Sequence, residues 1–176
     1  MNTLVISAFG LDASADIMNT DPFEEMVTNA QVYKNVVVSN TLIANAISSM
    51  MRLIQGAGGS SLKNCQSAAF KALAALVVSA NNQPSRRRSL LSFSPLLDLT
   101  HVAVISELAE NTVSQAKTDG ALSSSVSVSS SIEAVSNVMA NSGSIVTESA
   151  ENVVDSGSSI TFLNTVAATV KVMQKP

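Results

Sequence analysis

The chain has 176 residues, of which 46% are hydrophobic, 3% aromatic and 13% charged, and its formal net charge is −3. This composition excludes a disordered chain, which needs low hydrophobicity together with high charge. The length is typical of a single domain, so we expect residues 1–176 to form one globular unit. With so few aromatic side chains, its core has to consist of small aliphatic residues, and such a core favours closely spaced helices.

The first apolar stretch, from Thr3 to Leu11, has the outline of a short signal peptide, because Ala13 and Ala15 follow it at the spacing of a cleavage site. No Lys or Arg precedes this stretch, however, and Asp12 separates it from the two alanines. We therefore expect a short helix here. No run in the chain approaches the ~20 uninterrupted apolar residues of a membrane span, so no transmembrane segment is predicted.

The clearest helix start is at Asp21, which can cap the first turn, while the proline after it suits a position whose N–H has no helical partner. Glu24 can complete a capping box with Asp21. Apolar residues then recur at intervals of three or four, which predicts one long central helix over 22–55. Because such a helix would extend roughly 50 Å, a break near 39–40 or 48–49 is an alternative.

The glycine-rich segment at 56–61 predicts the end of this helix and the start of a second one over 62–80. The segment lacks the Gly-Lys-Ser/Thr ending of a phosphate-binding loop, so we interpret it as a linker. The only cysteine, Cys65, supplies neither a disulfide nor a zinc cage, and it is expected to be buried, although the sequence leaves its reactivity open. The residues predicted to share the inner face of this helix are Leu62, Cys65, Ala69, Leu73, Leu76 and Ala80.

Between residues 81 and 95 the composition changes to Asn, Gln, Pro, Ser and Arg, which predicts an exposed loop. It contains Arg86, Arg87 and Arg88, and this triplet is either a solvated loop tip or a processing site for proteases specific for basic residues. These are three of the four arginines, and acidic residues outnumber basic ones by thirteen to ten. Nucleic acid is therefore not expected as a partner, because it requires a clustered basic surface.

Thr100 is predicted to cap a third helix that ends near residue 120. His101, the only histidine, lies in the first turn of this helix. A Ser–His or Cys–His catalytic pair would have to use it, and a turn position is the better interpretation. The residues predicted to share one face of this helix are Val102, Ile105, Leu108, Ala109, Thr112, Val113 and Ala116.

The Ser-rich stretch at 120–131 is predicted to be the weak start of a fourth helix, 122–140, although the alternation at 126–128 also resembles a strand. A short helix over 145–154 and a final one over 158–173 complete the chain. The expected fold is an all-α, compact bundle of about five to six helices with a long central helix.

Reactive groups are sparse, and no enzymatic activity, cofactor or metal ion is predicted. The early acidic residues lack the spacing of a calcium loop and are interpreted as caps and first-turn charges, with calcium binding as a minor alternative. Methionines in a helical core can line a flexible apolar cavity, so a carrier of a small hydrophobic ligand in the bundle core is a further functional alternative. The acidic residues in question are Asp12, Asp16, Asp21, Glu24 and Glu25.

Several short motifs occur in an order that resembles one recurring helical module. They include Ala8-Phe9-Gly10-Leu11, Asp21-Pro22-Phe23, Ala30-Gln31-Val32-Tyr33, Asp98-Leu99-Thr100 and Ala167-Ala168-Thr169-Val170. Together they resemble the alanine-rich helical module of very large, secreted, cadherin-like or adhesin-like surface proteins of bacteria and algae. The resemblance covers most of the chain, departs from the module at His101 and Val102, where Asp and Pro are frequent, and assigns no functional residue.

The resemblance implies a non-catalytic structural or adhesion-associated module, part of a larger cell-surface or secreted protein, with an extracellular or cell-surface location. Its partners would be neighbouring modules or other proteins. The alternative is a small self-assembling protein of extrusive or filamentous bodies, which low charge and small-residue helix faces favour. The sequence leaves the oligomeric state, the identity of the partner and the completeness of the chain open.

Overall fold

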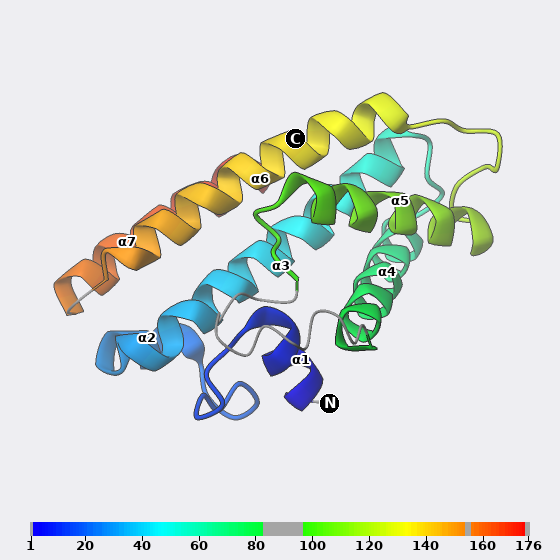
Figure 1. The fold of residues 1–176 in the computed structure, drawn as a ribbon. Helices are drawn as coiled ribbons and strands as arrows, with labels where there is room; N and C mark the ends of the chain where they lie inside the picture. Colours follow the sequence, from blue (N-terminus) through cyan, green and yellow to red (C-terminus); the bar gives the residue numbers. More distant parts are fainter. Residues whose placement is uncertain (1, 83–96, 154–155, 175–176) are drawn as a thin grey trace.

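The computed structural model describes residues 2–82, 97–153 and 156–174 (Figure 1), and all regular secondary structure in these ranges is helical. The all-α prediction is confirmed, with a helix count slightly above the expected five to six. The loop predicted at 81–95, with Arg86, Arg87 and Arg88, lies outside the described residues except for its first two positions, which belong to a helix. The seven helices are α1 (Asn2–Phe9), α2 (Pro22–Thr28), α3 (Ala30–Gly56), α4 (Leu62–Asn82), α5 (Val102–Thr118), α6 (Ser129–Glu151) and α7 (Ser156–Gln174).

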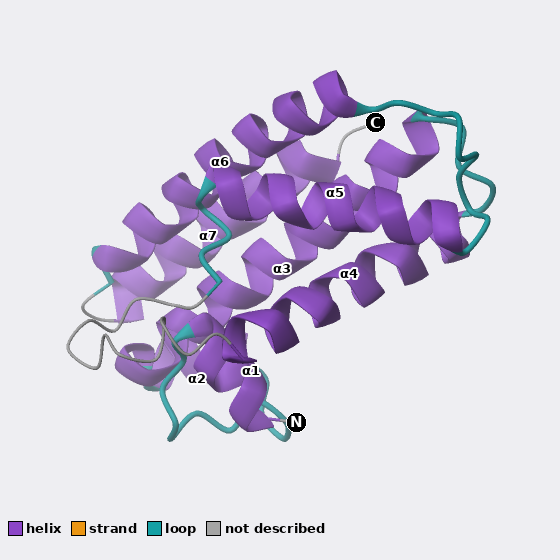
Figure 2. Ribbon diagram, turned by 45° about the vertical axis from the view of Figure 1, so that its right-hand side comes forward, coloured by secondary structure: helices purple, strands orange, loops and turns teal. Residues whose placement is uncertain are grey.

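The long helix α3 forms the centre of the bundle and contacts α2, α4, α5, α6 and α7. Each of α4, α5 and α6 also contacts the next helix along the chain, so the four helices from α4 to α7 surround α3. Figures 1 and 2 show α6 and α7 side by side along one flank of α3, with α4 and α5 along the other. The short helix α1 packs against α4, and α2 packs against the beginning of α3.

The helix predicted over 22–55 begins at the expected residue, as α2. A carboxylate oxygen of Asp21 accepts a hydrogen bond from the backbone N–H of Phe23 at 2.9 Å. The prediction of one helix over 22–55 is wrong, however. The chain leaves helical geometry at Asn29 (φ −137°, ψ 62°), so α2 and α3 are separate. Asparagine favours such positions because its side chain competes with helical backbone bonds. The two break points considered from the sequence, at 39–40 and 48–49, both lie inside α3, which is continuous there.

Helix α6 is continuous where two helices, 122–140 and 145–154, were expected. It begins only at Ser129, because serine side chains compete with the backbone for hydrogen bonds and weaken a helix start. Gly143 lies in the middle of α6 and is a packing residue. A Cβ atom there would lie 3.1 Å from Leu42 Cδ2 and 3.2 Å from Thr100 Cγ2, so glycine lets α6 approach α3 closely.

The start of α5 also differs from the expectation. His101 is the N-cap residue, and its side chain makes no capping hydrogen bond. Thr100 is not the cap, because its hydroxyl donates to Asp98 Oδ1 at 2.6 Å and its backbone N–H donates to the same oxygen at 2.9 Å. An ionised carboxylate is a stronger acceptor than a carbonyl, so Asp98 holds Thr100 in the turn before the helix.

The buried residues form two hydrophobic clusters. The first lies between α1, α4, α5, the second half of α3 and the first half of α6. The second lies where α2, the start of α3, the end of α6 and α7 meet, and it includes Met26, Tyr33 and Phe162. Most of the face predicted for 62–80 is in the first cluster, but Leu62, in the first turn of α4, is exposed.

Cys65 belongs to the first cluster and is fully buried. Removal from water disfavours the thiolate, so burial raises the pKa of the Cys65 thiol above its ordinary value. Because the thiolate is the reactive form of cysteine, this side chain is a packing group in the folded state.

Candidate functional site

An apolar groove of about 650 Å³ opens at the end of the bundle where α3 finishes. Its walls come from the last turns of α3, the first half of α6 and the far end of α7, and the segment 126–128 closes one end. The lining residues are Ser49, Arg52, Leu53, Gly56, Ala57, Val126, Ser127, Val128, Ser131, Ala134, Val135, Val138, Met139 and Val172.

The floor and the rim of this groove have different exposure. Leu53, Val128 and Met139 form the floor, and these three side chains are buried and belong to the first hydrophobic cluster. Val138 and Val172 lie at the rim and are 56% and 70% exposed. The groove is therefore a depression in the surface that reaches the bundle core, and it offers apolar surface that the described residues leave uncovered.

The sequence of α6 explains why one wall is apolar. Each of its lining residues lies three or four positions from another one, and such positions share one helix face. These residues are Ser131, Ala134, Val135, Val138 and Met139. The opposite wall on α3 ends in a glycine and an alanine. Small side chains on both walls leave the space that larger residues would fill.

The serine-rich segment is held against the groove by a backbone contact. The N–H of Ser60, in the turn between α3 and α4, donates to the C=O of Ala121 at 2.8 Å. This bond ties the end of α3 to the start of the segment that leads to α6. The valines Val126 and Val128 then reach the groove, and their strand-like alternation is the feature of the sequence that points to this position.

The polar groups of the groove are few. Arg52 is the only charged side chain among the lining residues in the described part of the chain. It is exposed, whereas Leu53 next to it is buried. Ser127 and Ser131 add exposed hydroxyl groups at the end of the groove near the start of α6. The groove thus combines an apolar floor with a rim that carries one positive charge and several hydrogen-bonding groups.

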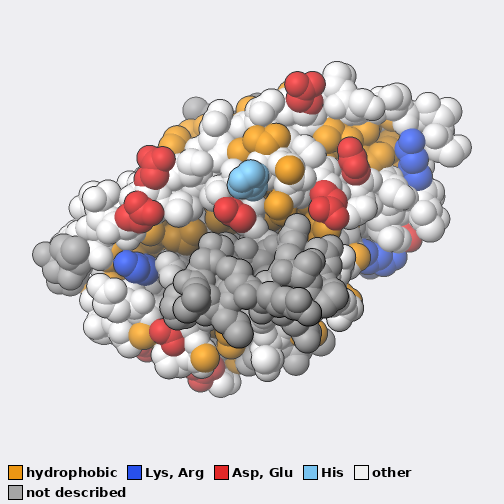
Figure 3. Space-filling model, in the orientation of Figure 1, with side chains coloured by type: hydrophobic (Ala, Val, Ile, Leu, Met, Phe, Trp, Pro, Cys, Tyr) orange, Lys and Arg blue, Asp and Glu red, His pale blue; other side chains and the backbone are white. Residues whose placement is uncertain are grey.

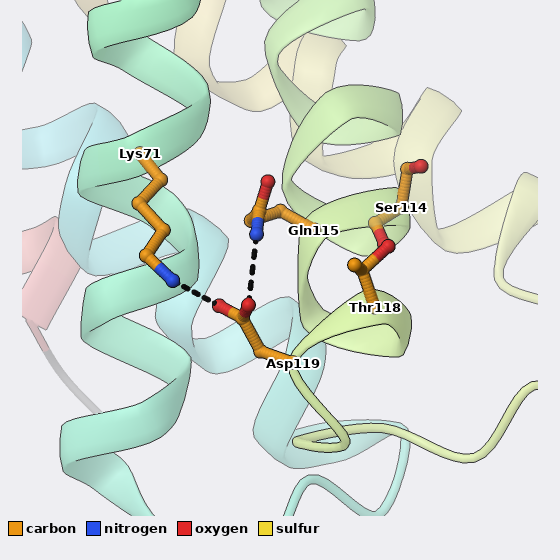
Figure 4. A network of polar contacts seen from close by, with 5 residues as sticks. All are labelled: Lys71, Ser114, Gln115, Thr118 and Asp119. Carbon is orange, nitrogen blue, oxygen red and sulfur yellow. Dashed lines mark hydrogen bonds and ion pairs between the residues drawn. The ribbon is translucent and has the colours of Figure 1, made fainter.

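A second cluster of polar side chains links α4 to the end of α5 (Figure 4). Lys71 Nζ lies 2.8 Å from Asp119 Oδ2, and Gln115 Nε2 donates to Asp119 Oδ1 at 2.9 Å. The hydrogen bond from Lys71 and that from Gln115 hold the pKa of the Asp119 carboxyl below its ordinary value of 3.8. The side chain of Lys71 is half exposed, and the cluster joins the surfaces of the two helices.

This arrangement gives a prediction for acid pH. A carboxyl whose pKa is lowered by folding stabilises the folded state at pH values above its ordinary pKa. That contribution disappears as the pH falls through the lowered pKa. Asp119→Asn should therefore unfold at a lower temperature than the wild type at neutral pH, and the gap should close below pH 3.8. Melting curves across this range test it, with Glu133→Gln, exposed on α6, as the control. A gap that stays constant down to acid pH would contradict the assignment.

The residues considered for catalysis are not brought together. His101 is exposed at the start of α5, whereas Cys65 is buried within the first cluster. Asp12 and Asp16 accept hydrogen bonds within their own turns, from Ser14 and from Asn19, and these bonds lower the pKa of both carboxyls. Among the described residues, no group of three or more His, Cys, Asp and Glu side chains is placed to hold a metal ion.

Helix α3 is long and apolar enough to cross a membrane by length and composition alone, although polar residues interrupt its apolar runs. In the bundle, 61% of the 18-residue window that meets this criterion is buried against other helices. The core helix of a bundle satisfies the same criterion, because both environments select apolar residues. The apolar character of α3 is explained by the helices that surround it.

The surface in the orientation of Figure 3 shows acidic side chains scattered singly, with hydrophobic side chains reaching the surface between α6 and α5.

Comparisons of the chain with protein-family models, with curated proteins and with solved structures found no match. The sequence did not locate the groove, because its lining comes from segments that are far apart in the chain, around residues 49–57, 126–139 and 172.

Proposed function

We propose that this chain is a non-catalytic binding module, and that the groove at the end of α3 holds a small apolar ligand. The observation that carries the proposal is the groove's combination of volume and lining. About 650 Å³ lies within the range of ligand sites in proteins, roughly 300–1,000 Å³, and such sites are mostly apolar with a few polar groups. The floor provides aliphatic surface, and each Å² that a ligand covers contributes about 25 cal/mol.

The proposal modifies the ligand-carrier alternative in one respect. That alternative placed the ligand in the core of the bundle, whereas the groove lies at its surface and only its floor belongs to the core. A surface groove lets a ligand enter and leave without opening the bundle. It also leaves the rim available for contacts with a neighbouring protein.

We further propose that the module is part of a larger cell-surface or secreted protein, where it has a structural or adhesion-associated role. The support is the ordered resemblance to the alanine-rich helical module. Its partners would be neighbouring modules or other proteins. The coding sequence on either side of this segment tests the proposal: β-rich repeat modules and a secretion signal are expected, and the absence of both would contradict it.

The binding site can be tested with a pair of matched variants on α6. Val138 lines the groove and is 56% exposed, whereas Ile145 is 53% exposed on the same helix and lies outside the lining. An aspartate at position 138 would place a charge on the apolar surface. Val138→Asp should therefore abolish the fluorescence gain of an apolar dye such as anilinonaphthalene sulfonate, and Ile145→Asp should leave it unchanged.

Circular dichroism and melting curves of both variants show whether each remains folded. Since both side chains are about half exposed, neither change removes a core contact, and we expect melting temperatures close to the wild type. Dye binding that is equally reduced in both variants, or in neither, would refute the groove as the binding site.

The exposed rim gives specific support to self-assembly as a second candidate function. Val138 and Val172 would be covered if a second copy of the chain docked on the groove. The two candidates differ in their dependence on concentration. Light scattering should show a monomer at all concentrations if the groove serves a ligand, whereas assembly that Val138→Asp prevents would favour self-association.

A further inference from the structure

The groove's lining restricts the shape of what it can hold. On α6 the lining extends from Ser131 to Met139, and the eight steps between them, at 1.5 Å each, span about 12 Å. Among the lining residues described, none is aromatic, so a ring system would find no stacking partner. The walls consist of valine, alanine, leucine and methionine, and methionine adapts its shape to a flexible ligand.

The charge of the groove restricts the ligand's polar end. Arg52 contributes the positive charge, and no acidic side chain lines the groove in the described part of the chain. Arginine suits carboxylates because its planar group presents several N–H donors in a fixed arrangement. Since Arg52 is exposed and Leu53 is buried, the charge lies at the rim and the apolar surface lies below it.

We infer that the ligand is a single unbranched aliphatic chain with a carboxylate head, in which the chain lies along the α6 wall and the head meets Arg52 at the rim. The inference rests on the proposed binding function and adds the chemical class of the ligand. The length of the α6 wall, about 12 Å, accommodates an extended chain on the order of ten carbons.

A series of straight-chain carboxylates of increasing length tests this inference, with displacement of the bound dye as the measurement and each compound kept below its micelle concentration. Burial of one methylene contributes enough free energy to lower Kd about fourfold. The Kd should therefore fall about fourfold per added carbon and then become constant at a length on the order of ten carbons, where the groove ends.

The head group is tested by comparing carboxylates with alcohols of the same length. Arg52→Gln should weaken carboxylate binding roughly tenfold, as expected for the loss of a charge-assisted hydrogen bond, and leave alcohol binding unchanged. Lys63→Gln is the control, because Lys63 is exposed on α4 outside the lining and the change removes the same charge.

The outcomes separate this inference from the function on which it rests. If Val138→Asp abolishes dye binding but carboxylates show no dependence on length, or if Arg52→Gln weakens alcohols and carboxylates equally, the ligand class is wrong and the groove remains a binding site. If dye binding survives Val138→Asp, both proposals fail. Dimerisation through the groove that carboxylates do not displace would show that a second copy is the occupant, and it would overturn the inference.

Discussion

Replacing Phe162 with alanine should lower the free energy of unfolding by about 3–5 kcal/mol, the usual cost of removing a buried aromatic side chain. Phe162 is 2% exposed and lies in the second cluster with Met26 and Tyr33. The aromatic ring is large relative to the valines and alanines around it. Its loss leaves a cavity at the junction of α2, α3 and α7.

Denaturant unfolding followed by circular dichroism measures this effect. The control is Ile160→Ala on the same helix, because Ile160 is 54% exposed and its truncation should change the unfolding free energy by no more than about 0.5 kcal/mol. A loss below about 1 kcal/mol for Phe162→Ala would mean that α7 is not packed against the bundle as described.

The second large effect is expected at Gly59, in the turn between α3 and α4. A Cβ atom at this position would lie 2.8 Å from Ile54 Cγ2, 2.8 Å from Ile54 O and 2.9 Å from Cys65 Sγ. Ile54 and Cys65 are fully buried, and the C=O of Ile54 already accepts the Gly59 N–H at 2.9 Å. None of these atoms can move without disturbing the core, so Gly59→Ala should cost about 1–3 kcal/mol.

Gly56→Ala is the matched control for this substitution. A Cβ atom at Gly56 meets nothing within 4 Å, and the residue is the last of α3. Alanine there should leave stability unchanged or raise it by up to about 1 kcal/mol, because alanine has the higher helix propensity. If both variants have the same unfolding free energy, the close contact at Gly59 is not a constraint.

The reaction rate of the Cys65 thiol provides an independent measurement for the variants Gly59→Ala and Gly56→Ala. Cys65 touches the position where the new methyl group of Gly59→Ala would lie, and it is buried in the wild type. Reaction with a thiol reagent requires the core to open, so its rate reports the opening of this region. Gly59→Ala should react faster than the wild type, and Gly56→Ala should react at the wild-type rate.

The sequence predicts α4 and α7 well because their residues repeat with helical spacing, and the glycine-rich segment at 56–61 also marks the start of α4. The errors occur where one residue type has two roles. Asn29 interrupts a helix and Asn40 continues it, and the difference depends on packing that the local sequence does not contain. Likewise, a glycine such as Gly143 predicts the end of a helix in the sequence. In the fold it lies inside α6 and permits close contact with Leu42, about a hundred residues earlier.

The candidate site was less predictable than the fold. Periodicity shows that α6 has an apolar face, but it cannot show which part of that face other helices leave uncovered. The groove is lined by Gly56, the last residue of α3, by Ala57 after it and by Ala134 of α6, so small residues from two distant segments coincide there. Only the valine alternation at 126–128 is a local sign of it, and alternation of this kind is also typical of strands.

The second hydrophobic cluster has a consequence for the order in which the molecule folds. It is built from both ends of the chain, and the hydroxyl of Ser159 donates to the C=O of Met26 across 133 residues of sequence. During synthesis, α2 and the first half of α3 therefore leave the ribosome with an uncovered apolar face and keep it until α7 emerges. Contacts between such distant segments form slowly, and the exposed face is open to aggregation or chaperone binding in that interval. Helix α7 thus completes the second cluster.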